Sequence, residues 1–263
     1  MKTQLPSLYM KLVFFTTVVA GIMAAFFKIV HPVAIATPNP MITIGVDFQQ
    51  LNSQIRERTI DPDSAKVKFK EIIKELRQIN LNYKDSLCVA DSIRFIFPIK
   101  NYTANSIGGK GMGYFPRHYN MFDHGLQVSH PAQDIFVRDL NSDNIDDNTG
   151  QPADVLAMRP GVVIGVETNW RPESDYRGGN FVWIYDPCMD GLFYYAHNSQ
   201  VQVQVGQKIN LGQKIGEVGR TGMNAAKLRS QTHLHLMYLQ LMPDGLPQPR
   251  NPYKWLQEAK TIR

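Results

Sequence analysis

The 263-residue sequence contains only two cysteines, Cys88 and Cys188, which lie far apart along the chain. Neither has a second cysteine or a histidine at metal-ligand spacing, so a thiolate metal site is not indicated. A chain of this length can bury a hydrophobic core without disulfide staples, which excludes the small disulfide-rich scaffolds. In an exported protein the two cysteines can form one disulfide, or they can remain two buried thiols, and the sequence leaves both open.

Long runs of basic residues are also absent. Lysine and arginine exceed aspartate and glutamate by 28 − 23 = 5, but no five basic residues follow one another. The scattered charges are typical of solvated faces and predict that the protein has no surface dedicated to nucleic acid. The positive net charge still permits an anionic partner such as a cell wall or a membrane surface.

The start of the sequence has one uncharged apolar stretch, residues 12–27, which follows two lysines. As a helix it would measure about 24 Å at ~1.5 Å per residue, which is short of the ~30 Å hydrocarbon core. Residues 1–36 therefore resemble a signal peptide cleaved after Ala34-Ile35-Ala36 or, if the residues after Lys28 lengthen the span, an N-terminal membrane anchor. Either would export the rest of the chain to the periplasm or cell envelope, secreted or anchored to the inner membrane.

Residues 37–92 are expected to hold a linker and one amphipathic helix. Pro38 and Pro40 mark the linker. From Asp61 to Leu81, apolar residues recur at a helical period among lysine, glutamate and arginine. The expected role of this helix is to pack against the domain that follows, and resting on a membrane surface is the alternative.

From Ser92 onward, short apolar runs separated by glycine, proline, asparagine and aspartate predict an all-β region. The runs expected to be strands are residues 93–99, 161–166, 181–185, 192–196, 201–205 and 232–241. The runs 181–185 and 192–196 predict a hairpin with a loop longer than two residues. The Gly-Gln pairs at 206–207 and 212–213 predict two tight turns, and Asn251-Pro252 predicts the start of a short helix.

Four histidines in or beside the β segments are the residues best suited to chemistry. The strand period of two places His233 and His235 on one face of their strand. Asp134 begins another apolar run, and a turn at Pro131 can bring His130 to the same point as this carboxylate. Imidazole and carboxylate are good zinc ligands, and a site with three protein ligands leaves the fourth position to water, which zinc activates as a nucleophile.

The order of these motifs resembles the lysostaphin-like zinc endopeptidases of peptidoglycan, in which an early His-x-x-x-Asp and a late His-x-His supply the metal site. The resemblance covers about residues 93–256, with Tyr195-Ala-His197 and Gly219-Arg-Thr-Gly222 between the two motifs. It implies a mainly β fold, with a metalloendopeptidase domain over residues 93–263. That domain would be an antiparallel β-sheet or β-sandwich, preceded by the N-terminal helix and the membrane-targeting segment.

Carried over residue by residue, the resemblance implies that His130, Asp134 and His235 bind one zinc ion. His197 and His233 would then be the catalytic groups, which exchange protons with water and the leaving amine or stabilise the developing oxyanion. The sequence does not divide these tasks between the two histidines.

Two features depart from the family pattern. Ala132 stands two places after the first ligand histidine, where the family has glycine, so the turn there can differ while the ligands remain. A stretch after the ligand aspartate places Asp139, Asn141 and Asp143 at the one-three-five spacing of a calcium loop, although Asn144 stands where that loop has glycine. A Ca²⁺ site and a solvated acidic turn are the two interpretations.

The expected function is that of an exported zinc-dependent endopeptidase, which hydrolyses amide bonds in the peptide stems or cross-links of peptidoglycan. The alternative is a non-catalytic regulator that binds the wall and activates other peptidoglycan hydrolases, but such proteins have lost ligands and none is missing here. A biotinyl or lipoyl carrier domain is a third interpretation, although the modifiable lysine on its tight turn is absent. His118 and His124 are expected to be loop residues near the cleft.

Overall fold

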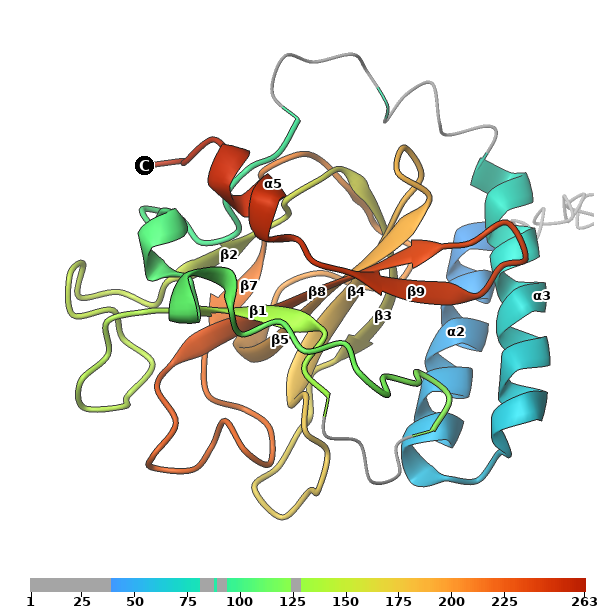
Figure 1. Cartoon of the computed structure of the whole chain (residues 1–263), viewed down its shortest axis with the longest axis horizontal. Coiled ribbons are helices and arrows are strands. Elements are labelled where there is room, and N and C mark those ends of the chain that lie inside the picture. Colours follow the sequence, from blue (N-terminus) through green and yellow to red (C-terminus); the bar gives the residue numbers. More distant parts are fainter. Residues whose placement is uncertain (1–38, 81–87, 89–93, 124–128) are drawn as a thin grey trace, which may run out of the picture. The chain divides into compact units, whose positions relative to one another are not determined.

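A nine-stranded antiparallel sheet forms the centre of the chain in a computed structural model (Figure 1). The structure describes residues 39–80, 88, 94–123 and 129–263. The targeting segment expected at residues 1–36, together with His31 and His124, lies outside the described residues. Within the described ranges, no helix has both the length and the apolar character that crossing a membrane requires.

The helices and strands follow one another with two helices first and the sheet after them. Their bounds are α2 (Pro40–Glu57), α3 (Pro62–Asn80), η1 (Ala104–Ser106), η2 (Gly108–Gly111), β1 (Ala132–Phe136), β2 (Asp154–Leu156), β3 (Gly161–Glu167), β4 (Asn180–Asp186), β5 (Gly191–Val201), β6 (Lys208–Ile209), β7 (Lys214–Val218), β8 (His233–Leu241), β9 (Pro247–Arg250) and α5 (Tyr253–Glu258). The main strand order is β1-β8-β5-β4-β3-β6. In addition, β9 pairs with β8, and β7 pairs with both β2 and the end of β5. The mainly β, antiparallel fold expected from the sequence is confirmed.

Each face of the sheet has its own hydrophobic core, because successive side chains of a strand point to opposite faces. One core contains Val182 of β4 and Leu236 of β8, together with buried residues of β2 and β7. The other contains the next residue of each strand, Trp183 and Met237, together with the buried sides of α2 and α3. His233 and His235 alternate in step with Met237, so they lie on the face that the helices cover.

Helix α2 occupies a segment for which the sequence predicted only a linker. The Asn39 side chain accepts a hydrogen bond from the backbone N–H of Met41 at 3.1 Å, and Pro40 takes the first helical position. Buried apolar residues then recur every three or four positions: Met41, Ile44, Phe48, Leu51 and Ile55. A side chain at Gly45 would overlap Val205, so glycine is required for α2 to approach the sheet.

Helix α3 agrees with the amphipathic helix expected from Asp61 to Leu81. Its apolar face, which includes Phe69, Ile73 and Leu76, is completely buried against the second core. The expected packing role of this helix is therefore confirmed.

Two of the predicted strands are wrong. In residues 93–99, of which 94–99 are described, only isolated bridges form, from Ile96 to Lys260 and from Ile99 to Val155. The segment cannot continue one ladder because Pro98 has no N–H to donate. In residues 201–205 the expected alternation of burial is present, but only Val201 belongs to a strand, because the chain turns at Gly206.

The other turn predictions are confirmed. A four-residue loop, 187–190, joins β4 to β5 as the expected hairpin. Gly206 and Gly212 have φ angles of 83° and 74°, the left-handed conformation that glycine adopts without strain, so both Gly-Gln turns are tight. At the start of α5, the Asn251 side chain accepts a hydrogen bond from the N–H of Tyr253 at 3.0 Å.

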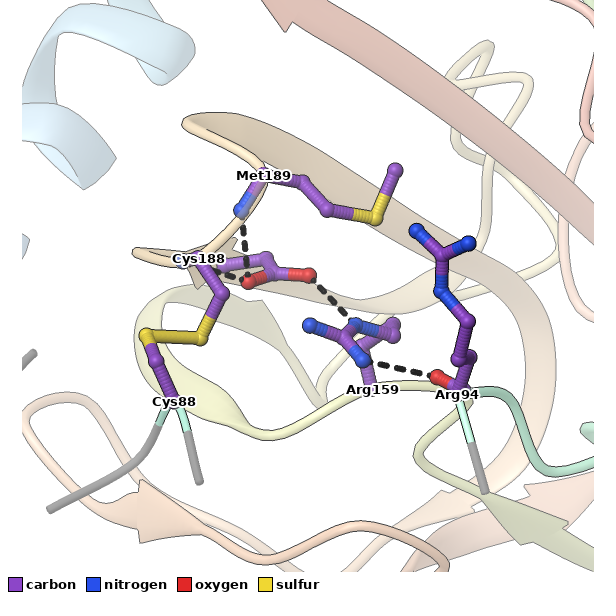
Figure 2. The surroundings of a disulfide bond; sticks show 6 residues. Cys88, Arg94, Arg159, Cys188 and Met189 are labelled. Atoms are coloured by element: carbon purple, nitrogen blue, oxygen red, sulfur yellow. Dashed lines mark hydrogen bonds and ion pairs between the residues drawn. A yellow bond between two sulfur atoms is a disulfide. The ribbon is translucent and has the colours of Figure 1, made fainter. Parts of the chain in front are cut away.

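Cys88 and Cys188 form a disulfide, so the alternative of two free thiols is wrong (Figure 2). Cys188 lies in the β4–β5 loop, whose backbone is held by the buried carboxylate of Asp186. That carboxylate accepts hydrogen bonds from the N–H groups of Cys188 and Met189 and from Nε of Arg159. Burial raises the pKa of Asp186, although the charge of Arg159 opposes the rise. The disulfide thus joins residue 88, which follows the helices in the chain, to a well-anchored loop of the sheet.

Candidate metal centre

The pairing of β1 with β8 assembles the predicted ligands. Asp134 and His235 are direct cross-strand neighbours in this antiparallel pair. His130 precedes β1 and is fixed by two backbone hydrogen bonds of 2.7 Å with Phe115. Ala132, the departure from the family pattern, is completely buried and pairs with Met237, so it leaves the strand regular.

Three ligand atoms form a nearly equilateral triangle. His130 Nε2 lies 3.2 Å from Asp134 Oδ1 and 3.2 Å from His235 Nδ1, and the third side, from His235 Nδ1 to Asp134 Oδ1, is 3.1 Å. A tetrahedral ion with bonds of about 2.1 Å has ligand atoms about 3.4 Å apart. The donor set therefore fits a small tetrahedral ion, and it is the only such cluster of three among the residues with described positions.

His197 reaches the site through a break in the strand pattern. Asn180 and Phe181 of β4 pair with Asn198 and Ala196 of β5, so His197 is an extra, bulged residue. Its φ angle is 69°, in the left-handed region that a histidine rarely adopts. Strict alternation would direct His197 to the face opposite Ala196. The bulge instead places its ring centroid 4.8 Å from that of His233 and 5.4 Å from that of His235.

Backbone carbonyls fix the proton positions on three of the rings. Nδ1 of His130 contacts the carbonyl of Gly113 at 2.7 Å, Nδ1 of His197 contacts that of Thr221 at 2.8 Å, and Nδ1 of His233 contacts that of Gln231 at 2.7 Å. A carbonyl oxygen only accepts hydrogen bonds, so each Nδ1 carries the proton. In a neutral ring, Nε2 is then left as a lone-pair donor to a metal or a proton.

The surroundings of Asp134 and His197 lower the pKa of both side chains. Burial alone would raise the pKa of Asp134, but the imidazoles of His130 and His235 hold it below its usual range. Burial lowers the pKa of His197 far below that of free histidine, and the rings of His233 and His235 lower it further. His197 is therefore neutral near pH 7 and able to accept a proton.

The centre lies in a cleft of about 770 Å³. Its floor includes Trp183, Tyr194 and Met237, which belong to the helix-covered face of the sheet. Its wall includes residues of α2 that the sequence analysis did not associate with the site, among them Asn52 and Arg56. The regular spacing of buried residues in α2 was the signal that could have revealed this helix.

The remaining sequence predictions for site residues have mixed outcomes. His118 is an exposed loop residue and does not line the cleft, although the neighbouring Tyr119 does. The calcium interpretation finds no support, because the Asp139 carboxylate is used within the protein. It accepts hydrogen bonds from the Thr232 hydroxyl and from the N–H groups of Asp143 and Asn144.

Part of the chain matches a known protein family. Residues 142–247 match the model of peptidase family M23. The match includes His197, His233 and His235, whereas His130 and Asp134 precede it. No curated protein matches the sequence.

Several solved structures are similar to the chain. The lytM protein of Ruminococcus gnavus shares 24% identity over 64% of this chain and 62% of that chain, with a TM-score of 0.45. The catalytic domain of lysostaphin from Staphylococcus simulans shares 26% identity over 55% of this chain and 87% of that chain, with a TM-score of 0.36. A zinc-containing peptidase from Vibrio cholerae shares 20% identity over 64% and 40% of the two chains, with a TM-score of 0.37. The chain thus spans less than two thirds of the lytM structure.

Proposed function

We propose that the chain, of which residues 142–247 match the model of peptidase family M23, is a zinc-dependent endopeptidase that hydrolyses amide bonds in the peptide stems or cross-links of peptidoglycan. One observation carries this proposal. The ligand triangle of His130, Asp134 and His235 is complete, and the rings of His197 and His233 lie beside it.

Zinc is the metal that suits this donor set, because two imidazole nitrogens and one carboxylate oxygen leave a fourth tetrahedral position open. When bound, zinc would polarise the scissile carbonyl and lower the pKa of water towards about 7. The bridge before β1 holds His130, β1 holds Asp134 and β8 holds His235. The ligand atoms are therefore already in place before a metal binds.

The two remaining histidines would move protons. His197 and His233 each donate Nδ1–H to a backbone carbonyl, which leaves Nε2 able to take a proton from the attacking water and give it to the leaving amine. The lowered pKa of His197 keeps its ring unprotonated at neutral pH. As an imidazolium, either ring would stabilise the oxyanion that develops on the substrate carbonyl.

We further propose that the protein acts outside the inner membrane, where peptidoglycan is its partner. The disulfide between Cys88 and Cys188 supports this location, since disulfides persist in oxidising compartments. The signal peptide or membrane anchor over residues 1–36 stays a prediction. A non-catalytic wall-binding regulator is not favoured, because no ligand or catalytic histidine is missing.

The test is digestion of purified peptidoglycan of each common cross-link type, with products identified by mass spectrometry. The zinc-loaded protein should release new amino termini, and both a chelator and His235→Ala should abolish the release. Cleavage that persists in the chelator would contradict the proposed mechanism. Binding of peptidoglycan without any cleavage by the zinc-loaded protein would favour the regulator instead.

A further inference from the structure

Positively charged side chains line the cleft in addition to the metal ligands. Three arginines line it, Arg56 and Arg58 at the end of α2 and Arg177 in the loop between β3 and β4. Apart from the ligand Asp134, the acidic residue that lines the cleft within the described chain is Asp175. Among the described residues that line the cleft, arginines therefore outnumber acidic residues.

Arg56 connects the end of α2 to the β3–β4 loop. Its guanidinium lies 4.3 Å from the ring centroid of Tyr176, the residue before Arg177, and 5.2 Å from that of Phe181. It also pairs with Glu167 at 3.2 Å, and its side chain is only 14% exposed. Arg56 is thus a partly buried contact that fixes the β3–β4 loop against the end of α2.

Arg58 occupies a backbone position that suits glycine. Its φ and ψ angles are 56° and 33°, and its N–H caps α2 by donating to the carbonyls of Gln54 and Ile55. Residues with this left-handed conformation at a helix end are usually glycine or asparagine, because a Cβ is strained there. From this position the Arg58 side chain lines the cleft.

We propose that Arg58 and Arg177 form a subsite that binds a carboxylate of the peptide substrate. The guanidinium group is planar and always charged, and its paired N–H groups match the two oxygens of a carboxylate. The inference rests on the proposed peptidase function and narrows its substrate. The chain would act on stems or cross-links that carry free carboxylates, and poorly on neutral glycine bridges.

The test uses the zinc-loaded full chain and two versions of one cross-linked stem peptide, the first with free carboxylates and the second with those carboxylates amidated. KM and kcat are measured for both, and binding of both is measured by titration calorimetry. The wild-type chain should prefer the free acid in KM and in affinity by about tenfold. Arg58→Gly and Arg177→Gln should each reduce that preference towards one.

Two controls separate this effect from loss of structure or of net charge. Glycine suits the backbone at position 58, so Arg58→Gly should fold normally, and Arg58→Lys should restore part of the preference. Arg263→Gly removes one positive charge at an exposed residue that does not line the cleft, and it should keep the wild-type preference.

The outcomes distinguish this subsite from the peptidase function. Equal binding of acid and amide by the wild type, or an acid preference that survives in Arg58→Gly and Arg177→Gln, would overturn the subsite even if both peptides are cut. An acid preference in binding that both variants lose, with no peptide cut by any protein, would support the subsite and contradict the peptidase function.

Discussion

At the scale of single residues, His235 and His197 lie close together, and we propose different tasks for them. His235 offers Nδ1 to the ligand triangle, whereas Nδ1 of His197 is engaged with the carbonyl of Thr221. We predict that His235→Ala removes zinc binding, while His197→Ala keeps most of the zinc and loses turnover by about a hundredfold or more. Zinc content by mass spectrometry and kcat measured on the same samples check this. Equal zinc loss in the two variants would contradict the division of roles.

Asp139 stabilises its loop through its negative charge. Burial alone would raise its pKa, but hydrogen bonds from Thr232, Asn144 and Asp143 outweigh burial and hold the pKa below the value of a free aspartate. A carboxyl group with a lowered folded-state pKa stabilises the folded protein at neutral pH, and this contribution is lost as the pH falls through that pKa.

We therefore predict that Asp139→Asn lowers the free energy of unfolding by about 1–3 kcal/mol at pH 7, with a smaller deficit below about pH 4. Urea unfolding of both proteins across this pH range is the measurement. Asp47→Asn, at an exposed aspartate of α2, is the control and should change stability much less. A deficit that is the same at every pH would mean that the charge of Asp139 is not the cause.

Residue types and spacing indicated His130, Asp134, His233 and His235 as candidates for one site, but the choice of His130, Asp134 and His235 as the ligands came from the resemblance. A period of two places His233 and His235 together, and His130 and Asp134 follow from their motif. The bulge that turns His197 into the site was not predictable in the same way, because strand alternation directs that residue to the other face. The assignment of His197 to the site came from the resemblance. The backbone carbonyls that contact the histidines became visible only in the structure.

At the scale of secondary structure, α2 depends on packing more than on helix propensity. Its β-branched residues and its central glycine disfavour a helix in isolation, and a proline stands on each side of Asn39. The helix forms because its apolar side covers the sheet, with the Phe48 ring 5.9 Å from Trp183 and 6.3 Å from Phe69. Pro38 and Pro40 pointed to a linker, although the apolar residues that follow them recur at a helical period.

This dependence on packing gives a quantitative expectation. Phe48 is 1% exposed, so Phe48→Ala should cost about 3–5 kcal/mol of unfolding free energy through lost burial and the cavity left behind. Val46→Ala is the matched control in the same helix, since Val46 is 53% exposed, and it should change stability by less than about 0.5 kcal/mol. Urea denaturation compares the two. Similar losses would indicate that α2 packs only loosely on the sheet.

At the scale of the whole described chain, contacts distant in sequence join the helices to the sheet. The Arg77 guanidinium of α3 pairs with Asp190 in the β4–β5 loop at 2.7 Å, and the disulfide reaches the same loop through Cys188. The Arg77–Asp190 pair could not be chosen from the sequence, and the sequence left open whether the two cysteines pair, because both contacts depend on which loop the helices meet. The Cys88–Cys188 bond closes a loop with a sequence separation of 100 residues.

Closing a loop of this length restricts the unfolded chain strongly. Replacing both cysteines with serine should therefore lower the free energy of unfolding by about 3–5 kcal/mol. The measurement is denaturant unfolding with and without reductant. Reductant should destabilise the wild type by a similar amount and leave the double variant unchanged. An unchanged wild type in full reductant would contradict this expectation.

The same bond divides the chain into a ring and two tails. His130 and Asp134 lie within the closed ring, whereas His197, His233 and His235 lie on the tail that follows it. A single protease cut anywhere between Cys88 and Cys188 would leave both pieces covalently attached. Such a nicked molecule would run as one species on a non-reducing gel and separate into two only after reduction. After a cut between Asp134 and Cys188 in an oxidising environment, the two groups of site residues would therefore stay covalently linked.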